Sequence, residues 1–196
     1  GFMNRPLRVL IVDDSAYIRK VVKEMLSREA SIEVVGAARD GEDALELVER
    51  LHPDVVTCDL IMPGVGGVEF IRRQMAVRPV PIVIVSIAAE SSERVLSGLD
   101  AGAIDFVQKP TALATEKVYD LGEELVSKIL AAAEAPLGRL REVTPAEPLP
   151  PVSYSGRYDV VVIAVSTGGP QGLKSVIPRL PAEFPVPLVI VLHMPI

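Results

Sequence analysis

The chain contains a single cysteine, Cys58, and no tryptophan, and aromatic residues make up only 4% of it. One cysteine cannot form an internal disulfide. Because Cys58 stands within an apolar segment, we expect it to be a small buried side chain, which suits a reducing cytoplasm. Aromatic residues are scarce although 49% of the residues are hydrophobic, and this composition favours α/β layers over an aromatic-rich β-sandwich.

Long apolar runs and basic stretches are also lacking. No apolar run approaches the roughly 20 residues that a membrane-spanning helix needs, and no secretory signal opens the sequence, so we expect a cytoplasmic location without membrane insertion. The net charge is −6, and because residues 136–196 hold five basic and four acidic residues, residues 1–135 carry −7. Neither part has a basic stripe, so nucleic-acid binding is not expected. The acidic first part suggests a bound cation or a basic partner, although a solvated acidic surface would look the same.

Residues 5–133 alternate between strand-like and helix-like patterns. The expected strands are 7–12, 33–35 (ending at Gly36), 55–58, 82–85 (ending at Ser86) and 104–107. The apolar spacing predicts helices over 16–28, 41–51, 67–76, 91–100 and 116–133. Five such units predict an α/β domain with a doubly wound, five-stranded parallel sheet.

Polar side chains follow four of the expected strands. Asp13 and Asp14 come after the first strand, Asp59 after the third, Ser86 after the fourth and Lys109 after the fifth. The carboxyl ends of parallel strands share one edge of the sheet, where ligands bind. Asp59 alone is more simply a turn residue, and the set could be unrelated surface polar residues. Three converging carboxylates would repel one another unless a cation joined them, and Mg²⁺ suits such a site.

The remaining two side chains suggest what the site does. Lys109 supplies a positive charge for a phosphoryl oxygen, and the Ser86 hydroxyl can donate to another such oxygen. A carboxylate nucleophile beside a metal ion, a lysine and a hydroxyl can accept a phosphoryl group. Asp59 is therefore the candidate acceptor.

These residues carry a family resemblance. The runs Asp13-Asp14-Ser15, Asp59-x-x-Met62-Pro63 and Lys109-Pro110, together with Ser86, resemble the flavodoxin-like receiver domain of two-component response regulators. The resemblance implies that Asp59 is the phosphoacceptor, and that Mg²⁺ is held by Asp14, Asp59 and the backbone carbonyl of Ile61, with Asp13 assisting through water. It also implies phosphoryl contacts from Ser86 and Lys109, a switch aromatic at Phe106 and a cis Lys109–Pro110 bond. Gly66 departs from the aspartate that is common there in the family, and as a helix cap it should cost only a few tenths of a kcal/mol.

Residues 134–157 differ in composition from the segments before them. Five prolines and several small residues interrupt any periodic pattern there, and this composition predicts a partly extended linker between two domains.

A second α/β unit is expected over residues 158–196, with strands at 158–163 and 187–192 and a helix at 171–179. Ser166 follows the first strand on a tight glycine-rich turn, and His193 follows the second. A serine there is a plausible nucleophile and the histidine its base, but the turn could equally be a helix cap or a phosphate loop, and the histidine structural.

The runs Ser166-Thr167-Gly168-Gly169 and His193-Met194-Pro195, behind a receiver and a linker, resemble the start of the chemotaxis protein-glutamate methylesterases. This resemblance implies that Ser166 is the acyl nucleophile and His193 its base, oriented by an aspartate that is absent from these residues. We therefore expect a truncated catalytic domain that is inactive in this chain. Ala164-Val165 replace the Gly-Ala that usually precedes the serine. We expect this replacement to affect how closely the backbone packs in the turn and the specificity of the esterase.

The predicted function is that of a response regulator, phosphorylated on Asp59 by a chemotaxis histidine kinase, that controls demethylation of methyl-accepting chemoreceptors. Glutamine deamidation would use the same acyl chemistry. One alternative is a receiver that acts only as a phosphorylation-dependent interaction module, and the exposed strands 158–163 and 187–192 could then pair with another copy of the chain or dock on the receiver. Another alternative, a DNA-binding response regulator, is disfavoured because a small basic helical domain should then follow the linker.

Overall fold

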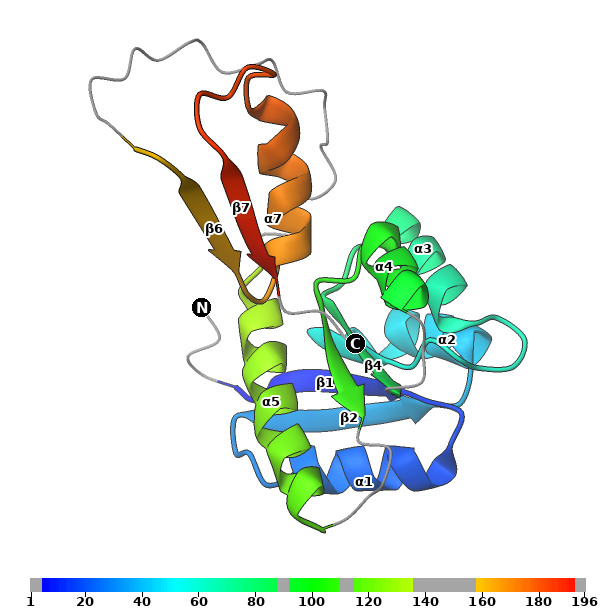
Figure 1. The fold of residues 1–196 in the computed structure, drawn as a ribbon. Coiled ribbons are helices and arrows are strands. Elements are labelled where there is room, and N and C mark those ends of the chain that lie inside the picture. The colour runs from blue at the N-terminus through cyan, green and yellow to red at the C-terminus, as the bar shows by residue number, and fades with distance from the viewer. Residues whose placement is uncertain (1–4, 88–91, 110–114, 136–157, 193–196) are drawn as a thin grey trace.

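The computed structural model describes residues 5–87, 92–109, 115–135 and 158–192. Its larger sheet has five parallel strands in the order β2-β1-β3-β4-β5 (Figure 1). The strands are β1 (Leu7–Val12), β2 (Ile32–Ala38), β3 (Val55–Cys58), β4 (Ile82–Ile87) and β5 (Asp105–Lys109). The helices are α1 (Ala16–Leu26), α2 (Gly41–Leu51), α3 (Gly67–Val77), α4 (Ser92–Ala101) and α5 (Thr115–Ala133). This confirms the predicted doubly wound fold, and the chain reverses its direction of winding between β1 and β3.

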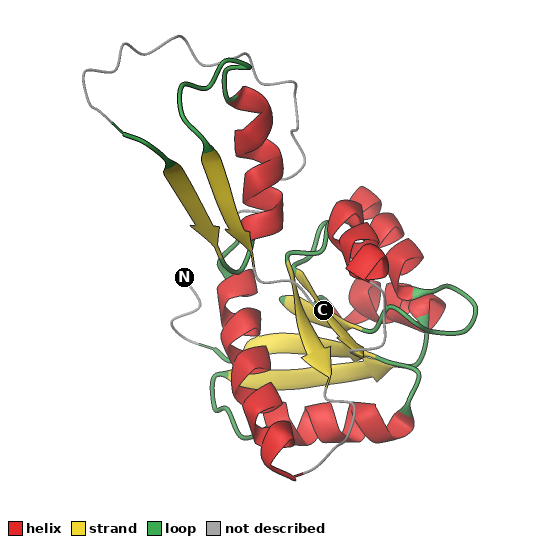
Figure 2. Cartoon of the chain, in the orientation of Figure 1, coloured by secondary structure: helices red, strands yellow, loops and turns green. Residues whose placement is uncertain are grey.

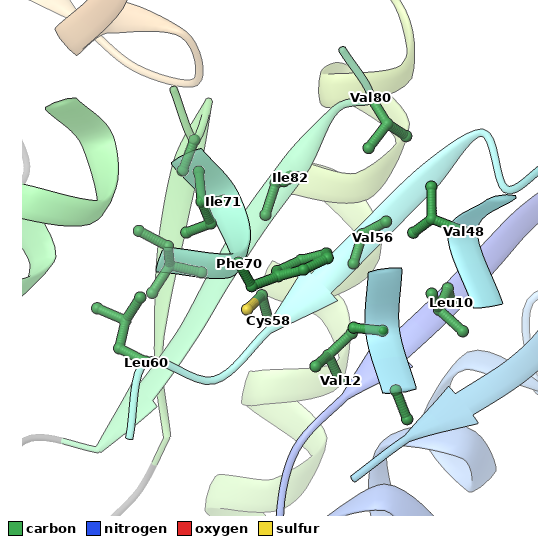
Figure 3. Close-up of a cluster of buried hydrophobic side chains, with 14 of the residues drawn as sticks. Leu10, Val12, Val48, Val56, Cys58, Leu60, Phe70, Ile71, Val80 and Ile82 are labelled. Carbon is green, nitrogen blue, oxygen red and sulfur yellow. The ribbon is translucent and has the colours of Figure 1, made fainter. Parts of the chain in front are cut away.

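Helices cover both faces of the sheet. On one face α1 and α5 bury side chains such as Leu26 and Leu125 against the strands. On the other face α2, α3 and α4 bury a second cluster, in which the Phe70 ring of α3 lies against Val56 and Cys58 of β3 (Figure 3). Cys58 is a free, fully buried thiol, as predicted, and burial raises its pKa well above the usual value. The two layers hold β3 in the middle of the domain, so the residue that follows it has a fixed position.

β2 is longer than predicted, because it continues through Gly36 to Ala38. Val9 pairs with Val34 but Leu10 pairs with Gly36, so β2 accommodates one extra residue in a bulge. Gly36 fits this position because a Cβ there would lie 2.7 Å from the Leu51 side chain. The glycine therefore marks an irregularity in the strand and not its end.

β4 and β5 also extend further than predicted. Ser86 pairs with Gln108 and Ile87 pairs with Lys109, so Ser86 is the second-last residue of β4 and Lys109 is the last residue of β5. Neither residue stands in a loop beyond its strand. The pairing of two neighbouring strands thus fixes the backbone of both residues.

A second, two-stranded parallel sheet contains β6 (Val161–Val165) and β7 (Leu188–Leu192). In sequence, α7 (Gly169–Val176) and a 3₁₀ turn, η1 (Ile177–Arg179), come between these two strands. Figure 2 shows the helix beside the pair of strands. The prediction of a strand at 158–163 was wrong by three residues at its start and two at its end, because pairing begins where the Val161 amide donates to the Pro187 carbonyl and continues to Val165–Leu192. The helix begins at Gly169, two residues before the predicted start.

Several expectations fall partly or wholly outside the described residues. Most of the predicted linker, residues 136–157, lies outside them, as does Pro110 of the Lys109–Pro110 bond. Among the helices that are described, even the 19-residue α5 lacks the apolar length required to cross a membrane.

Candidate functional site

The turn from β1 into α1 carries two carboxylates at the carboxyl edge of the sheet. The Asp13 amide donates to the carbonyl of Ala38, and the Asp13 carboxylate accepts from the Ser15 amide at 2.9 Å. The Ser15 hydroxyl in turn accepts from the Ile18 amide and caps α1. Asp13 is only 3% exposed, whereas Asp14 is exposed. The turn therefore presents one buried and one accessible carboxylate.

Asp59 follows β3 directly and lies beside this turn. Its amide donates to the Val12 carbonyl at 2.8 Å, and its Oδ1 accepts from the Ile61 amide at 3.1 Å. Asp59 is 7% exposed. The side chain is thus held by its own loop while its main chain is held by β1.

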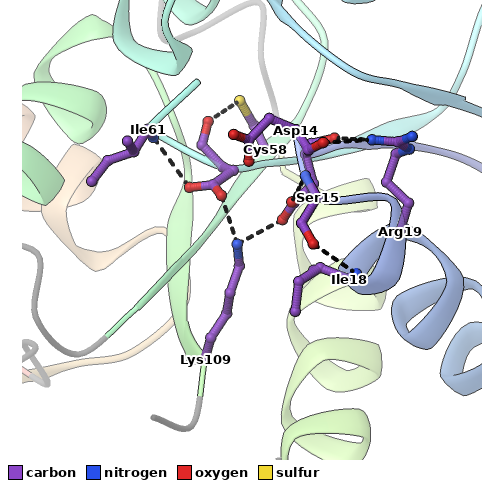
Figure 4. A network of polar contacts seen from close by, with 9 residues as sticks. Asp14, Ser15, Ile18, Arg19, Cys58, Ile61 and Lys109 are labelled. Atoms are coloured by element: carbon purple, nitrogen blue, oxygen red, sulfur yellow. Dashed lines mark hydrogen bonds and ion pairs between the residues drawn. The ribbon is translucent and has the colours of Figure 1, made fainter. Parts of the chain in front are cut away.

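Lys109 joins the two buried carboxylates. Its Nζ donates to Asp13 Oδ2 at 2.6 Å and to Asp59 Oδ2 at 2.7 Å (Figure 4). Burial by itself would lower the pKa of Lys109, but the charges of Asp59 and Asp13 outweigh burial and raise that pKa above its usual value. Lys109 therefore stays protonated at neutral pH and is bound to both carboxylates.

One lysine does not neutralise this cluster. Burial raises the pKa of Asp13, the Asp59 charge raises it further, and Lys109 offsets these effects only in part. Ligand atoms of Asp13, Asp14 and Asp59 all lie within 4.8 Å of one another. Three hard oxygen donors at this spacing, one of them exposed, fit Mg²⁺, which takes few carboxylates and keeps other positions for water or phosphate oxygens.

Ser86 and Phe106 lie on β4 and β5, and both are 1% exposed. Ser86 is on the strand next to β3, so it shares an edge of the sheet with Asp59. The Phe106 carbonyl accepts from Lys128 Nζ, which also lies 4.9 Å from the centre of the Phe106 ring. The Lys128 contacts tie β5 to α5 at the position that the sequence suggests for a switch.

Ser166 lies directly after β6, where its carbonyl accepts from the Gly169 amide at 2.7 Å. Gly168 has a φ of 77°, a conformation that favours glycine, and a Cβ on Gly169 would lie 2.6 Å from that of Val165. Ser166 is exposed on this tight turn, as predicted. His193 lies outside the described residues, so its distance from Ser166 stays untested.

Two polar contacts of the structure were not predicted from the sequence. Arg19 of α1 donates through Nη1 to the carbonyls of Asp13 and Asp14. Gln171 of α7 donates through Nε2 to the carbonyls of Leu99 and Ala103, at the end of α4. Long side chains that reach main-chain carbonyls leave no periodic signal, although Arg19 does stand one helical turn after the Ser15 cap.

Comparison with known proteins identifies both parts of the chain. Residues 9–117 match the response regulator receiver domain. The chain belongs to this family. Its receiver fold resembles the crystal structure of the response regulator domain of Thermotoga maritima CheB, with a TM-score of 0.62 and 36% sequence identity over 67% of this chain and 98% of that one.

After this receiver comes part of a methylesterase region, since residues 161–196 match CheB methylesterase. A protein-glutamate methylesterase/protein-glutamine glutaminase of Myxococcus xanthus is 48% identical over 198 residues, which covers 97% of this chain and 56% of that protein. One from Halalkalibacterium halodurans is 42% identical, with 98% and 56% covered. The chain covers 56% of each of these two proteins, so it spans about half the length of the curated relatives it matches.

Gly67, at the start of α3, offers a test of how tightly the loop after Asp59 is packed. A Cβ at this position would lie 2.1 Å from the Asp59 carbonyl oxygen and 2.7 Å from Leu60 Cα. Gly67→Ala should therefore displace the loop, lower the free energy of unfolding by about 1–3 kcal/mol and slow phosphorylation. The control is Gly122→Ala in α5, whose nearest neighbour would be 3.7 Å away and which should stabilise by about 0.5–1 kcal/mol. Urea unfolding measures both, and equal stability of the two variants would contradict the packing.

Proposed function

We propose that the protein is a response regulator in which Asp59 accepts a phosphoryl group from a chemotaxis histidine kinase, and that this modification controls a methylesterase. The observation that carries the proposal is the Lys109 ammonium group shared between Asp13 and Asp59 within an acidic cluster. A buried cation beside a nucleophilic carboxylate is suited to hold the oxygens of an incoming phosphoryl group.

Each residue of the site has a role in this transfer. An oxygen of the Asp59 carboxylate forms the new bond to phosphorus while the bond to the donor breaks. Lys109 then contacts a phosphoryl oxygen, and the Ser86 hydroxyl donates to another. Asp13, Asp14, Asp59 and the Ile61 carbonyl would hold Mg²⁺, which would offset the charge that gathers on the phosphoryl oxygens.

The proposed organisation is a receiver at 5–133, a linker at 134–157 and the first part of a methylesterase domain at 158–196. In the longer protein, Ser166 would attack the ester carbonyl while His193 takes the hydroxyl proton and passes it to the departing oxygen, so that methanol leaves and an acyl-serine forms. Water would then attack the acyl-serine, which releases the glutamate carboxylate and restores the serine hydroxyl. The substrates would be glutamate methyl esters of methyl-accepting chemoreceptors, and glutamine side chains would react by the same steps. Such a protein would act in the cytoplasm.

Contacts between the two parts support regulation of the serine turn by the receiver. A Cβ on Gly168, two residues after Ser166, would lie 4.0 Å from the side chain of Ile104, the residue before β5. Lys174 of α7 forms an ion pair with Asp100 of α4, close to the Gln171 contacts described above. Leu99 belongs to the same buried cluster as Phe106, so a change at β5 would reach the surface on which α7 rests.

The test of this proposal is methanol release from methylated receptors by the longer protein, with and without a phosphodonor. Phosphorylation should increase the rate, and Asp59→Asn should remove the increase but leave the basal rate. A rate that is equal with and without the donor, in a protein shown to be phosphorylated, would contradict control by the receiver.

A second candidate function is a phosphorylation-dependent interaction module. It is favoured by the apolar side chains that β6 and β7 leave exposed, such as Val162 at 57% and Val191 at 53%. Strands with such faces could pair with a second copy of the chain. Sedimentation of the 196-residue chain should then show a dimer that Val162→Lys disrupts, whereas a monomer at all concentrations would count against this role.

The metal site gives a further prediction. Mg²⁺ at ten times its Kd should stabilise the protein by about 1.4 kcal/mol and raise Tm by about 3–5 °C, because it relieves the repulsion among the carboxylates. Asp14→Ala should abolish this shift and slightly stabilise the metal-free protein, since it removes one repelling charge. Glu49→Ala, which removes an exposed acidic residue of α2, should keep the shift. A melting temperature that millimolar Mg²⁺ leaves unchanged would show that the cluster does not bind this ion.

A further inference from the structure

Arg19 braces the turn that carries the two adjacent aspartates. Its Nη1 donates to the Asp13 carbonyl at 2.8 Å and to the Asp14 carbonyl at 3.0 Å (Figure 4). The amide of Arg19 also donates to the Ser15 carbonyl at 3.0 Å. One residue of α1 therefore binds three consecutive carbonyls of the turn.

We propose that Arg19 is a positioning residue for the metal ligands, an inference that rests on the proposed function. The Asp13 carboxylate has its own supports, because it accepts from the Ser15 amide and from Lys109. Asp14 is exposed, so the direction of its carboxylate depends on the main chain from which it projects. Because Arg19 hydrogen-bonds to that main chain, it fixes the direction in which the Asp14 carboxylate projects toward the cation.

Two effects of Arg19 on metal affinity oppose each other. Its positive charge close to the site repels a divalent cation, so removing the charge alone would tighten Mg²⁺ binding. Such repulsion is weak between solvent-accessible groups and is screened by salt. Loss of a group that orients metal ligands, in contrast, typically weakens affinity by about 10–100-fold. The orienting effect therefore dominates, and removal of Arg19 weakens binding.

Lys20 separates the two effects. Lys20 is the next residue of α1 and is exposed, and its Nζ lies 3.9 Å from Glu24 Oε1. Lys20→Ala therefore removes one positive charge from the same helix without removing a contact to the turn. Arg19→Lys keeps the charge and the N–H donors of a single nitrogen, although an ammonium group lacks the planar fork of a guanidinium. Arg19→Gln keeps a donor without the charge.

The experiment measures the Kd of Mg²⁺ by calorimetry on the unphosphorylated 196-residue chain, and then the phosphorylation rate against Mg²⁺ concentration with acetyl phosphate. Arg19→Ala should raise both the Kd and the half-saturating Mg²⁺ concentration about tenfold, while the rate at saturating Mg²⁺ stays within about twofold of wild type. Arg19→Lys should recover most of the affinity, Arg19→Gln part of it, and Lys20→Ala should change it by less than about twofold.

The outcomes separate this inference from the proposed function. If the wild-type chain neither binds Mg²⁺ nor accepts a phosphoryl group, the proposed function fails. If the wild type does both but Arg19→Ala matches Lys20→Ala in its Kd, only the positioning role is overturned. A lower rate that saturating Mg²⁺ does not restore, in Arg19→Ala and Arg19→Lys alike, would also overturn it, since that pattern indicates general damage to the turn. If Arg19→Ala fails to fold, Arg19→Gln and Arg19→Lys decide the same question.

Discussion

Asp59→Asn should reduce phosphorylation of the protein by acetyl phosphate and Mg²⁺ by at least about 10³-fold, equivalent to about 4 kcal/mol in the barrier. An amide has no anionic oxygen with which to attack phosphorus, whereas the Asp59 carboxylate has one on the side occupied by Lys109. Intact-mass spectrometry after a fixed reaction time measures the loss.

The asparagine variant should still fold, because an amide has the shape of the carboxylate and its oxygen can accept from Lys109 or from the Ile61 amide. Circular dichroism checks this. Asp159→Asn, which changes an exposed aspartate in the segment before β6, is the matched control and should be phosphorylated like the wild type. Labelling of Asp59→Asn at the wild-type level would exclude Asp59 as the acceptor.

A polypeptide of these 196 residues should release methanol from methylated receptors at least about 10⁴-fold more slowly than a longer one that completes the methylesterase region. Parallel strands need cover on both faces, yet Val162, Ile190 and Val191 are 57%, 43% and 53% exposed. The sequence of residues 158–196 contains a single aspartate, Asp159, which is exposed and precedes β6. The orienting aspartate that the methylesterase resemblance implies is therefore not expected among these residues. Loss of the orienting aspartate alone costs about 10⁴ in a serine protease.

The assay compares the two polypeptides at equal concentration, with Ser166→Ala in the longer one as the control for background hydrolysis. The short chain should match that control. Turnover by the short chain that depends on Ser166 and approaches the rate of the longer polypeptide would contradict this prediction. It would mean that β6, α7 and β7 alone assemble a working cleft.

The central strands and the shared edge of the sheet could be predicted because the relevant signals are local. β3 is a short apolar run that is followed by an aspartate. In a parallel sheet the carboxyl ends of all the strands lie at the same edge. The convergence of Asp13, Asp59 and Lys109 follows from that rule alone. The two ion pairs of Lys109 Nζ do not follow from it, since a strand pattern does not specify the direction of a long side chain.

Other features depend on contacts far apart in sequence and could not be predicted from it. The bulge in β2 arises where Leu51 of α2 approaches Gly36. The bounds of β6 follow from its register with β7, because an apolar run such as 160–165 fits several registers and the neighbouring strand selects one. The contacts of Gln171 with α4 join residues about 70 positions apart, and no periodic pattern encodes them.

The most direct test of the proposed acceptor site is to locate the phosphoryl group on the protein. After reaction with acetyl phosphate, borohydride reduction converts an aspartyl phosphate to homoserine, and peptide mass spectrometry then locates the converted residue. The expected result is homoserine at position 59 alone, dependent on Mg²⁺ and lost when the ion is chelated. Conversion at another aspartate, or full conversion at position 59 without Mg²⁺, would contradict the site described here.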